Sequence, residues 1–381
     1  MATFGKVDLA ALSDDPMSPQ QDAGLRQVCE RAEVVVQSSP QRWTSATLSF
    51  LRGQTATEGL FWSKRLANVL SSWVDDTNYD LIVATCSSMA QYALLPKLKE
   101  IPTIVDLIDV DSQKWLDYGD KSRFPKRLLY RTEGFRLRRL EQKIVDHAKA
   151  VLLVNEREAE LFRHVVPNQR THAVCNGVDT DYFYRSTSAQ NTNQLHCAFI
   201  GVLNYRPNED GLKWFCQSVW PAIIKRYPNA SFSIVGKSPS DEVVALGKMP
   251  GISIHANVPD VRPYLDQATV VVAPLQIARG TQNKVLEAMA MGKPVIATRQ
   301  ALEGIDLEVG KDALEANAPS EWVSTISRLN ENKVETEGLK DSAREFVLHR
   351  HNWNSCLKPI NDIAKTITES SNSCQTAVTA S

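Results

Sequence analysis

Lys284 and Glu287 stand three residues apart and are the two residues best placed to do chemistry together. The apolar run 270–274 predicts a strand buried on both faces, and the polar loop 276–282 leads from it to a helix that starts near residues 281–283. Residues i and i+3 share a helix face, and the backbone amides at a helix start can bind a phosphate. A cation and a carboxylate beside such amides suit a nucleotide diphosphate and its ribose.

A second group of polar residues follows the predicted strand 103–107. Asp106, Asp109 and Asp111 alternate there, and an extended segment would present Asp109 and Asp111 on one face. Paired carboxylates can act as acid and base, and loop carboxylates can equally cap the next helix. Both interpretations stay open, and Asp109 is the candidate contact to an acceptor.

Composition excludes several classes of protein. The 381 residues are enough for two domains with a core each, and the formal net charge of −1 argues against a general nucleic-acid-binding protein. Neither a signal peptide nor an apolar run of about 18 residues is present. We therefore expect a cytoplasmic protein that spans no membrane.

The seven cysteines and seven histidines show no spacing typical of a metal site. No C-x2-C pair occurs, which favours reduced and mostly buried thiols over disulfides or zinc ligands. His349 and His351 are close in sequence, but two alternating histidines are more often surface residues than a site. We expect neither a bound metal nor a cofactor.

Short apolar runs alternate with helical stretches along the chain, which predicts βα units and parallel sheets. The first set has strands at 7–11, 33–36, 80–84, 103–107, 151–154 and 172–175, and helices at 20–31, 60–75, 88–99, 125–147 and 156–164. The second set has strands at 197–200, 232–235, 252–255, 270–273 and 295–297, and helices that begin after Pro207, Pro239, Pro259, Thr281 and Pro319.

A polar stretch at 185–194 reads as a linker between the two sets. We expect two doubly wound α/β domains, 1–185 and 195–350, with a cleft between them. A C-terminal helix at 351–367 would pack back on the first domain, and the Ser- and Thr-rich tail 368–381 would be disordered. Asn176 and Gly177 tolerate positive φ, so they predict a turn near the domain boundary.

Residues 121–143 form a basic amphipathic segment. This segment contains nine basic residues and only two acidic ones, interleaved with Phe and Leu side chains. Such a helix could bind an anionic membrane surface, or it could pack its apolar stripe on its own sheet and leave a solvated basic face. Both roles are compatible with one helix.

Four stretches together resemble one known family: residues 105–115, 176–183, 201–211 and 279–298. The chain resembles glycosyltransferase family 4, and in detail it is similar to sugar transferases associated with exosortase (PEP-CTERM) and exopolysaccharide loci. The resemblance implies the GT-B fold, in which two Rossmann-like domains face each other across a cleft. It also implies a hexosyltransferase that moves a sugar from a UDP- or GDP-linked donor to a glycan or lipid-linked acceptor, with retention of configuration and without a metal.

The resemblance assigns roles to particular residues. Glu287 matches the glutamate that contacts the nucleotide ribose, whereas Arg279 stands where most members have a glutamate that holds the donor hexose. Val202 stands where many members have an arginine, so the diphosphate would be met by Lys284, Arg279 or Arg206. The remaining residues expected at the donor site are Gly201, Gly280 and Thr281.

The amino terminus departs from the family, because members open with a βα unit that this sequence lacks before residue 7. Either the start is placed late or the protein works without that unit. Two other functions stay open: a nucleotide-sugar-binding protein without transferase activity, and a sugar-nucleotide epimerase or hydrolase on the same fold. We expect the protein to act in exopolysaccharide or cell-surface glycan synthesis, at the inner face of the cytoplasmic membrane.

Overall fold

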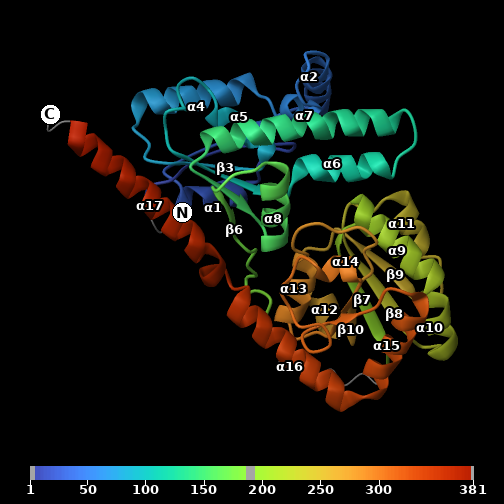
Figure 1. The fold of residues 1–381 in the computed structure, drawn as a ribbon. Helices are drawn as coiled ribbons and strands as arrows, with labels where there is room; N and C mark the ends of the chain where they lie inside the picture. The colour runs from blue at the N-terminus through green and yellow to red at the C-terminus, as the bar shows by residue number, and fades with distance from the viewer. Residues whose placement is uncertain (1–4, 186–193, 379–381) are drawn as a thin grey trace. The chain divides into compact units, whose positions relative to one another are not determined.

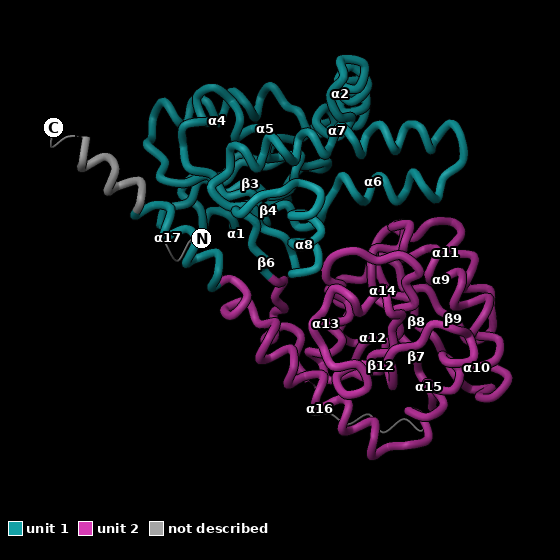
Figure 2. The backbone as a smooth tube through the Cα atoms, viewed as in Figure 1, with its two compact units in different colours: residues 1–174, 358–381 teal, residues 175–357 magenta. Residues whose placement is uncertain are grey.

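The computed structural model describes residues 5–185 and 194–378, and the chain forms two compact units (Figure 2). Unit 1 comprises Met1–Val174 and Lys358–Ser381, and unit 2 comprises Cys175–Leu357. The chain therefore passes between the units twice, after Val174 and after Leu357. Most of the predicted linker, residues 185–194, lies outside the described residues.

Unit 1 contains two parallel sheets. One pairs β1 (Asp8–Ser13) with β2 (Arg31–Val36), and the other has the order β3-β4-β5-β6. The four strands are β3 (Ile82–Thr85), β4 (Thr103–Ile108), β5 (Ala150–Leu153) and β6 (Thr171–Ala173). All six predicted strands are confirmed, because each is a short apolar or β-branched run that needs burial on a pleated surface.

The helices of unit 1 include three that the sequence analysis did not predict. Among the described residues up to Val174 the helices are α1 (Pro19–Val28), α2 (Ser39–Leu51), α3 (Ala56–Leu60), α4 (Lys64–Asp76), α5 (Ser87–Ala93), α6 (Asp111–Asp120), α7 (Lys126–His147) and α8 (Glu156–Val165). The unpredicted ones are α2, α3 and α6. Thr55 and Glu58 close a capping box that starts α3, and Glu133 of α7 accepts hydrogen bonds from the amides of Ala56 and Thr57. A local capping box and a buried partner from another helix thus both stabilise the start of α3.

Helix α17 (Trp353–Val378) supplies part of the core of unit 1. Its residues Ala364 and Ile360 pack against Ile104 of β4 and Leu152 of β5. The prediction of a disordered tail from residue 368 is wrong up to Val378, where the helix ends. After Pro359 the helix contains neither glycine nor proline, so nothing in the sequence stops a helix that upstream packing has already nucleated.

Unit 2 is built on a single parallel sheet with the order β12-β11-β10-β7-β8-β9. The strands are β7 (His196–Val202), β8 (Ser231–Lys237), β9 (Ile252–Ala256), β10 (Val270–Ala273), β11 (Val295–Ala297) and β12 (Leu314–Glu315). The five predicted strands are confirmed, and β12 is too short to be recognised from its two residues. From β7 the chain adds strands on one side, and from β10 it adds them on the other. The carboxyl ends of β7 and β10 therefore mark the topological switch point, where doubly wound folds bind their ligands.

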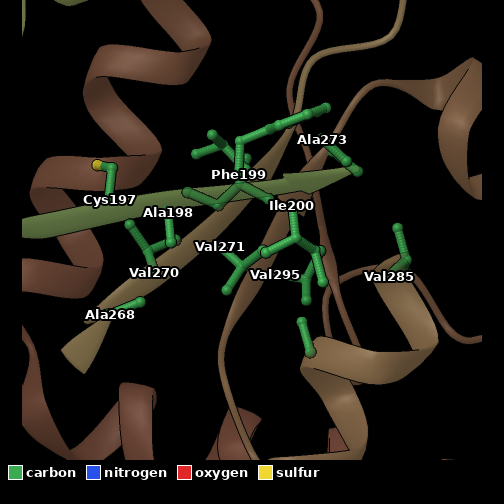
Figure 3. Packing of buried hydrophobic residues seen from close by; sticks show 14 of the residues in the cluster. Cys197, Ala198, Phe199, Ile200, Ala268, Val270, Val271, Ala273, Val285 and Val295 are labelled. Carbon is green, nitrogen blue, oxygen red and sulfur yellow. The ribbon is translucent and has the colours of Figure 1, made fainter. Parts of the chain in front are cut away.

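The helices of unit 2 cover a sheet whose strands are buried on both faces. They are α9 (Arg206–Ser218), α10 (Trp220–Arg226), α11 (Asp241–Leu246), α12 (Arg262–Gln267), α13 (Asn283–Ala290), α14 (Arg299–Leu302), α15 (Pro319–Glu331) and α16 (Lys333–Arg350). Figure 3 shows Phe199, Ile200 and Val271 within one large apolar cluster that also takes in α13. Fully burying a side chain of this size contributes about 1.5–3 kcal/mol. The two doubly wound α/β domains that the sequence predicts are confirmed.

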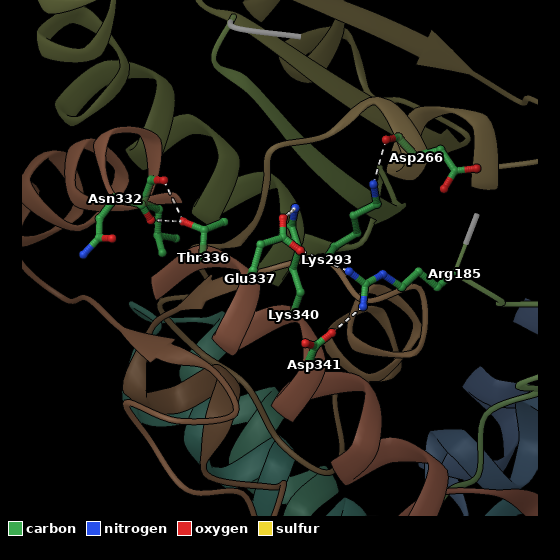
Figure 4. Close-up of polar contacts among 9 residues, drawn as sticks. Arg185, Asp266, Lys293, Asn332, Thr336, Glu337, Lys340 and Asp341 are labelled. Carbon is green, nitrogen blue, oxygen red and sulfur yellow. Dashed lines mark hydrogen bonds and ion pairs between the residues drawn. The ribbon is translucent and has the colours of Figure 1, made fainter. Parts of the chain in front are cut away.

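Polar contacts join α16 and the loops of unit 2 around this core (Figure 4). Arg185 pairs with Glu337 at 3.1 Å and with Asp341, both on α16. Lys293 donates to the carbonyl oxygen of Asp266 at 2.7 Å. These contacts fix the ends of segments whose apolar faces already pack on the sheet.

In the part of the chain that the structure describes, no helix combines the length and the apolar character needed to cross a membrane.

Candidate functional site

The candidate donor site lies at the switch point of unit 2. Strand β7 ends at Gly201 and Val202, and Gly236 lies beside Gly201 on β8. A Cβ on Gly236 would stand 1.7 Å from the carbonyl oxygen of Gly201, so these two backbones approach more closely than any side chain allows. Lys284 of α13 lies beside this end of β7, because a Cβ on Gly201 would stand 3.4 Å from its Cε.

Lys284 is held over the end of β7 by two partners. Its Nζ donates to Oδ1 of Asn208 at 2.6 Å and lies 5.0 Å from the centre of the Phe199 ring. Asn208 is itself buried and donates through Nδ2 to the carbonyl oxygen of Val202 at 2.8 Å. Burial lowers the pKa of Lys284 to about 8, against a smaller opposing effect of Glu287. An ammonium group in such surroundings gains from an anionic partner.

Glu287 lies on the same face of α13 as Lys284, as the i, i+3 spacing predicts. Burial raises the pKa of its carboxyl group, and the charge of Lys284 opposes that rise. The other residues from Val285 to Ala290 are buried, whereas Lys284 and Glu287 are half-buried. The helix therefore offers one polar face, and that face carries both predicted ligand contacts.

The loop before α13 is held by side-chain contacts to carbonyl oxygens. Gly280 adopts φ of 64°, and the hydroxyl of Thr281 donates to the carbonyl oxygen of Gly304 at 3.1 Å. Nε2 of Gln282 donates to the carbonyl oxygen of Arg279 at 3.0 Å, and α13 has no side-chain cap. The Thr281 side chain thus positions the loop, and a phosphate at this helix start would be bound by main-chain N–H groups.

The two arginines predicted to share the diphosphate differ in their surroundings. Arg206 is the first residue of α9, is exposed, and lies 3.6 Å from Asp210 one turn further on. Arg279 is half-buried in the loop before α13. Both are in unit 2 with Lys284, so unit 2 contains every residue predicted at the donor site.

Asp109 lies in unit 1, at the carboxyl end of β4. The strand has an irregular register between Asp106 and Ile108, and Ile108 adopts φ of 68°, a conformation that β-branched residues rarely take. Oδ1 of Asp106 accepts the amide of Ile108 at 3.2 Å, and burial raises the pKa of this carboxyl group. Asp111 starts α6 and accepts a hydrogen bond from Ser87 at 2.5 Å. Helix α6 has no side-chain cap, so the capping interpretation is wrong for this helix, and Asp109 stays the candidate acceptor contact.

The neighbouring strand, β3, is also followed by a non-glycine residue with positive φ, Cys86. Cys86 adopts φ of 67°, and its amide donates to the carbonyl oxygen of Asp106 at 2.6 Å. Two adjacent strand ends of unit 1 thus carry non-glycine residues with positive φ. Such strain persists where the surrounding structure imposes it, and it is common at binding sites.

Sequence reasoning missed Asn208 and Phe199, and it misjudged Gly177. A signal for Asn208 exists, because it is a polar residue on the face of α9 that also carries the buried Leu212 and Phe215. The predicted turn at Asn176 and Gly177 is wrong, since neither residue has positive φ. Gly177 is required instead by packing, because a Cβ there would lie 2.7 Å from the Trp353 ring.

Comparison with protein families gives a match in each half of the chain. Residues 4–177 match the family described as glycosyl transferase 4-like domain, and residues 194–332 match the family described as glycosyl transferases group 1. The second match contains all the candidate donor-site residues. No curated protein matches the sequence.

Solved structures similar to this one cover nearly the whole chain. Sucrose-phosphate synthase from Thermosynechococcus elongatus is 16% identical with a TM-score of 0.68, over 95% of this chain and 99% of that one. HepE from Anabaena, solved in complex with UDP, is 16% identical with a TM-score of 0.64, over 96% of this chain and 100% of that one. At this identity the likeness concerns the fold, and these relatives share it across both units.

Proposed function

We propose that this chain, a family 4-like glycosyltransferase with the GT-B fold, moves a hexose from a nucleotide-sugar donor to a glycan or lipid-linked acceptor. The transfer retains the anomeric configuration and uses no metal or cofactor. The donor is UDP- or GDP-linked, and the pathway is the synthesis of an exopolysaccharide or another cell-surface glycan, as in exosortase-associated loci.

The observation that carries this proposal is the polar face of α13 at the switch point. Lys284 places a cation whose pKa burial has lowered beside a helix start that no side chain caps, and Glu287 places a carboxylate one turn further on. A diphosphate supplies the anion for Lys284 and the acceptor for the amides, and a ribose supplies hydroxyl donors for Glu287. HepE, which has the same fold, was solved with UDP and with UDP-glucose.

In the proposed reaction Lys284 stabilises the negative charge that develops on the leaving diphosphate, and the amides before α13 hold it in place. Glu287 anchors the ribose, which orients the bond to the sugar without touching it. Arg279, in the loop before α13, is placed towards the donor sugar, and Asp109 contacts the acceptor. No nucleic acid takes part.

The test is thermal unfolding of the full chain with UDP, GDP, ADP and a panel of nucleotide sugars. A ligand at 100 times its dissociation constant stabilises the folded protein by about 2.7 kcal/mol. We expect one nucleotide to raise the unfolding temperature, and Glu287→Gln to reduce that shift. Glu242→Gln, an exposed glutamate on α11, is the matched control and should keep the full shift. An equal shift in both variants would remove Glu287 from the site.

One alternative function has a specific observation in its favour. Arg279 occupies a position that the family resemblance assigns to a sugar-binding glutamate, so the chain could bind nucleotide sugar without transferring it. Incubation with radiolabelled donor and acceptor extracts distinguishes the two. Donor-dependent labelling of a glycan or lipid fraction supports transfer, whereas binding without labelling in any fraction supports the alternative. Release of free nucleotide without acceptor would favour a hydrolase.

We also propose that the enzyme works on an anionic membrane surface through residues 121–129, which comprise the turn between α6 and α7 and the first residues of α7 (Figure 1). This segment holds four basic residues and no acidic one, and Phe124, Leu128 and Leu129 are 81%, 63% and 48% exposed. Exposed apolar groups among cations match the boundary between acyl chains and lipid headgroups. Farther along α7, Leu137, Leu140 and Ile144 are buried, so core packing and a free basic end occur on the same helix.

The basic residues of α7 are not equivalent. Arg136 donates to the carbonyl oxygens of Phe50 and Gln54, and Arg138 donates to Gln113, so neutralising these two would disturb the fold. Lys126→Gln with Arg127→Gln should weaken sedimentation with vesicles of anionic lipid by roughly 30-fold, from about 1 kcal/mol for each charge. Arg139→Gln with Lys143→Gln removes the same charge from exposed positions and is the control. Equal weakening of vesicle sedimentation by both double substitutions would indicate that any basic residue of α7 contributes, and would contradict a specific role of residues 121–129.

A further inference from the structure

Two segments far apart in the sequence lie side by side in unit 2, next to the two points where the chain passes between the units. The amide of Val178 donates to the carbonyl oxygen of His351 at 2.7 Å, and Val178 forms a parallel bridge with Asn352. The close packing of Gly177 on Trp353 joins the same two segments. Their side chains are therefore brought together by tertiary structure alone.

Three metal-ligating side chains converge where these segments meet: Cys175, His351 and Cys356. One ligand atom of each lies within 4.8 Å of the other two. His351 and Cys356 are buried, at 5% and 1% exposure, and Cys175 is half-buried. In a tetrahedral zinc site the ligand atoms stand about 3.5–3.8 Å apart, given Zn–S and Zn–N bonds of about 2.3 and 2.0 Å. Small side-chain rotations would close the cluster around one ion.

The surroundings of the three side chains favour a metal. Nδ1 of His351 lies 2.9 Å from the carbonyl oxygen of Asn176, and because a carbonyl can only accept, Nδ1 carries the proton. That contact holds the ring in place and leaves the neutral imidazole one lone pair, as in metal sites whose histidines are oriented by a backbone carbonyl. The present partners of the thiols are weak, with carbonyl oxygens 3.4–3.8 Å from the sulfur atoms. Their replacement by metal–sulfur bonds costs little.

We propose that Cys175, His351 and Cys356 bind Zn²⁺, with water as the fourth ligand. Two thiolates and an imidazole are the ligand set that a borderline-soft d¹⁰ cation prefers over Mg²⁺ or Ca²⁺, which take oxygen. The ion would link residues adjacent to both passages of the chain between units, at Val174 and Leu357. It would be structural and take no part in the proposed transfer, which needs no metal.

The test is metal binding by the full chain, stripped with a chelator under a thiol-free reductant. Titration with Zn²⁺ against a chromophoric chelator should give one ion per chain, and Co²⁺ should give thiolate-to-metal charge-transfer absorption with the visible bands of tetrahedral coordination. Cys175→Ser should lose both signals. Cys29→Ser, which removes a half-buried cysteine of unit 1, should retain both signals. Unchanged stoichiometry in Cys175→Ser would overturn the proposal.

A second measurement needs no variant, so it holds even if a substitution disturbs folding. Zn²⁺ should slow alkylation of Cys175 and Cys356 in the native protein at least tenfold, while alkylation of Cys29 stays unchanged, as read from peptide masses. Equal alkylation of Cys175 with and without Zn²⁺ would exclude the site. Recovery of a peptide in which Cys175 and Cys356 form a disulfide under the same reducing conditions would also overturn it.

Discussion

The two units differ in how their apolar cores are divided and in where positive φ occurs at their strand ends. Among the described residues, unit 2 has one large apolar cluster that runs through its whole sheet, whereas unit 1 divides its core into three smaller clusters. In unit 2 the switch point combines the close approach of Gly201 and Gly236 with the hydrogen-bonded Lys284 of α13. In unit 1 positive φ occurs at Cys86 and Ile108, at the ends of β3 and β4. In unit 2 it occurs at Ser238 and Asn257, after β8 and β9, and not at the ends of β7 and β10.

This difference matches what each unit has to bind under the proposed function. A nucleotide diphosphate is a flexible ligand of constant composition, and a site on a single continuous core holds its groups in one geometry. An acceptor glycan is larger and more variable, and a unit with several small clusters can alter one strand end without repacking the rest. Four predictions test this comparison.

The largest effect is expected at the glycine pair of unit 2. Gly236→Ala places a Cβ 1.7 Å from the carbonyl oxygen of Gly201, so β7 and β8 must separate. We expect the free energy of unfolding in urea to fall by about 4 kcal/mol or more. Gly338→Ala on α16, where an added Cβ meets nothing within 4 Å, should instead stabilise by about 0.5–1 kcal/mol. A tolerated Gly236→Ala would show that the unit 2 strand ends are less rigid than the comparison requires.

Removing the cation of the donor site comes next. Lys284→Met keeps most of the side-chain volume over Phe199 but loses the charge and its bond to Asn208. A lost charge-assisted hydrogen bond costs about 1.5–3 kcal/mol, so calorimetry should show nucleotide-sugar affinity reduced roughly 10- to 150-fold. Lys293→Met removes the other half-buried lysine near α13 and should leave affinity unchanged. If Lys284→Met binds the nucleotide sugar as tightly as the unsubstituted protein, the diphosphate does not bind at α13.

The pH dependence of binding should follow the pKa of Lys284, which lies at about 8 in the free protein. A bound diphosphate favours the protonated form, so affinity should fall about fourfold between pH 7 and 8.5 as the lysine deprotonates. Lys284→Arg keeps its proton in this range and should flatten the profile. Without ligand the direction reverses: above pH 8 the unfolded chain binds more protons, so the free energy of unfolding should rise towards pH 10.5.

The smallest effect concerns the strained strand end of unit 1. Ile108→Asn places a residue that tolerates positive φ where the backbone has φ of 68°, and strain of this kind costs about 1–3 kcal/mol. Part of that gain is offset by the loss of a partly packed side chain, so we expect stabilisation of about 0.5–1 kcal/mol. Val36→Asn, an exposed β-branched residue at the end of β2, should destabilise. If both substitutions destabilise, the backbone at Ile108 is not under strain.

The strands and the polar face of α13 could be predicted because their signals are local. A run such as Val270–Ala273 is apolar over consecutive residues, and the spacing of Lys284 and Glu287 places them on one face whatever surrounds the helix. Helices α2 and α6 both start without a side-chain cap, and at the start of α6 the amide of Ser112 donates to Glu141 of α7. Glu133 and Glu141, two acidic residues within a basic segment, turn out to be buried acceptors for amides of other segments.

By itself, the sequence determined that the chain has two halves built of repeating βα units, and that Lys284 and Glu287 share one face of a helix. Both could be predicted because periodicity and propensity act over a few neighbouring residues. Only the tertiary structure decided that Asn208 and Phe199 hold Lys284, that Ile108 ends its strand with positive φ, and that Cys175 meets His351 and Cys356. Each of these depends on contacts between segments far apart in the chain, and such contacts form only when buried polar groups find partners and apolar faces close on one another.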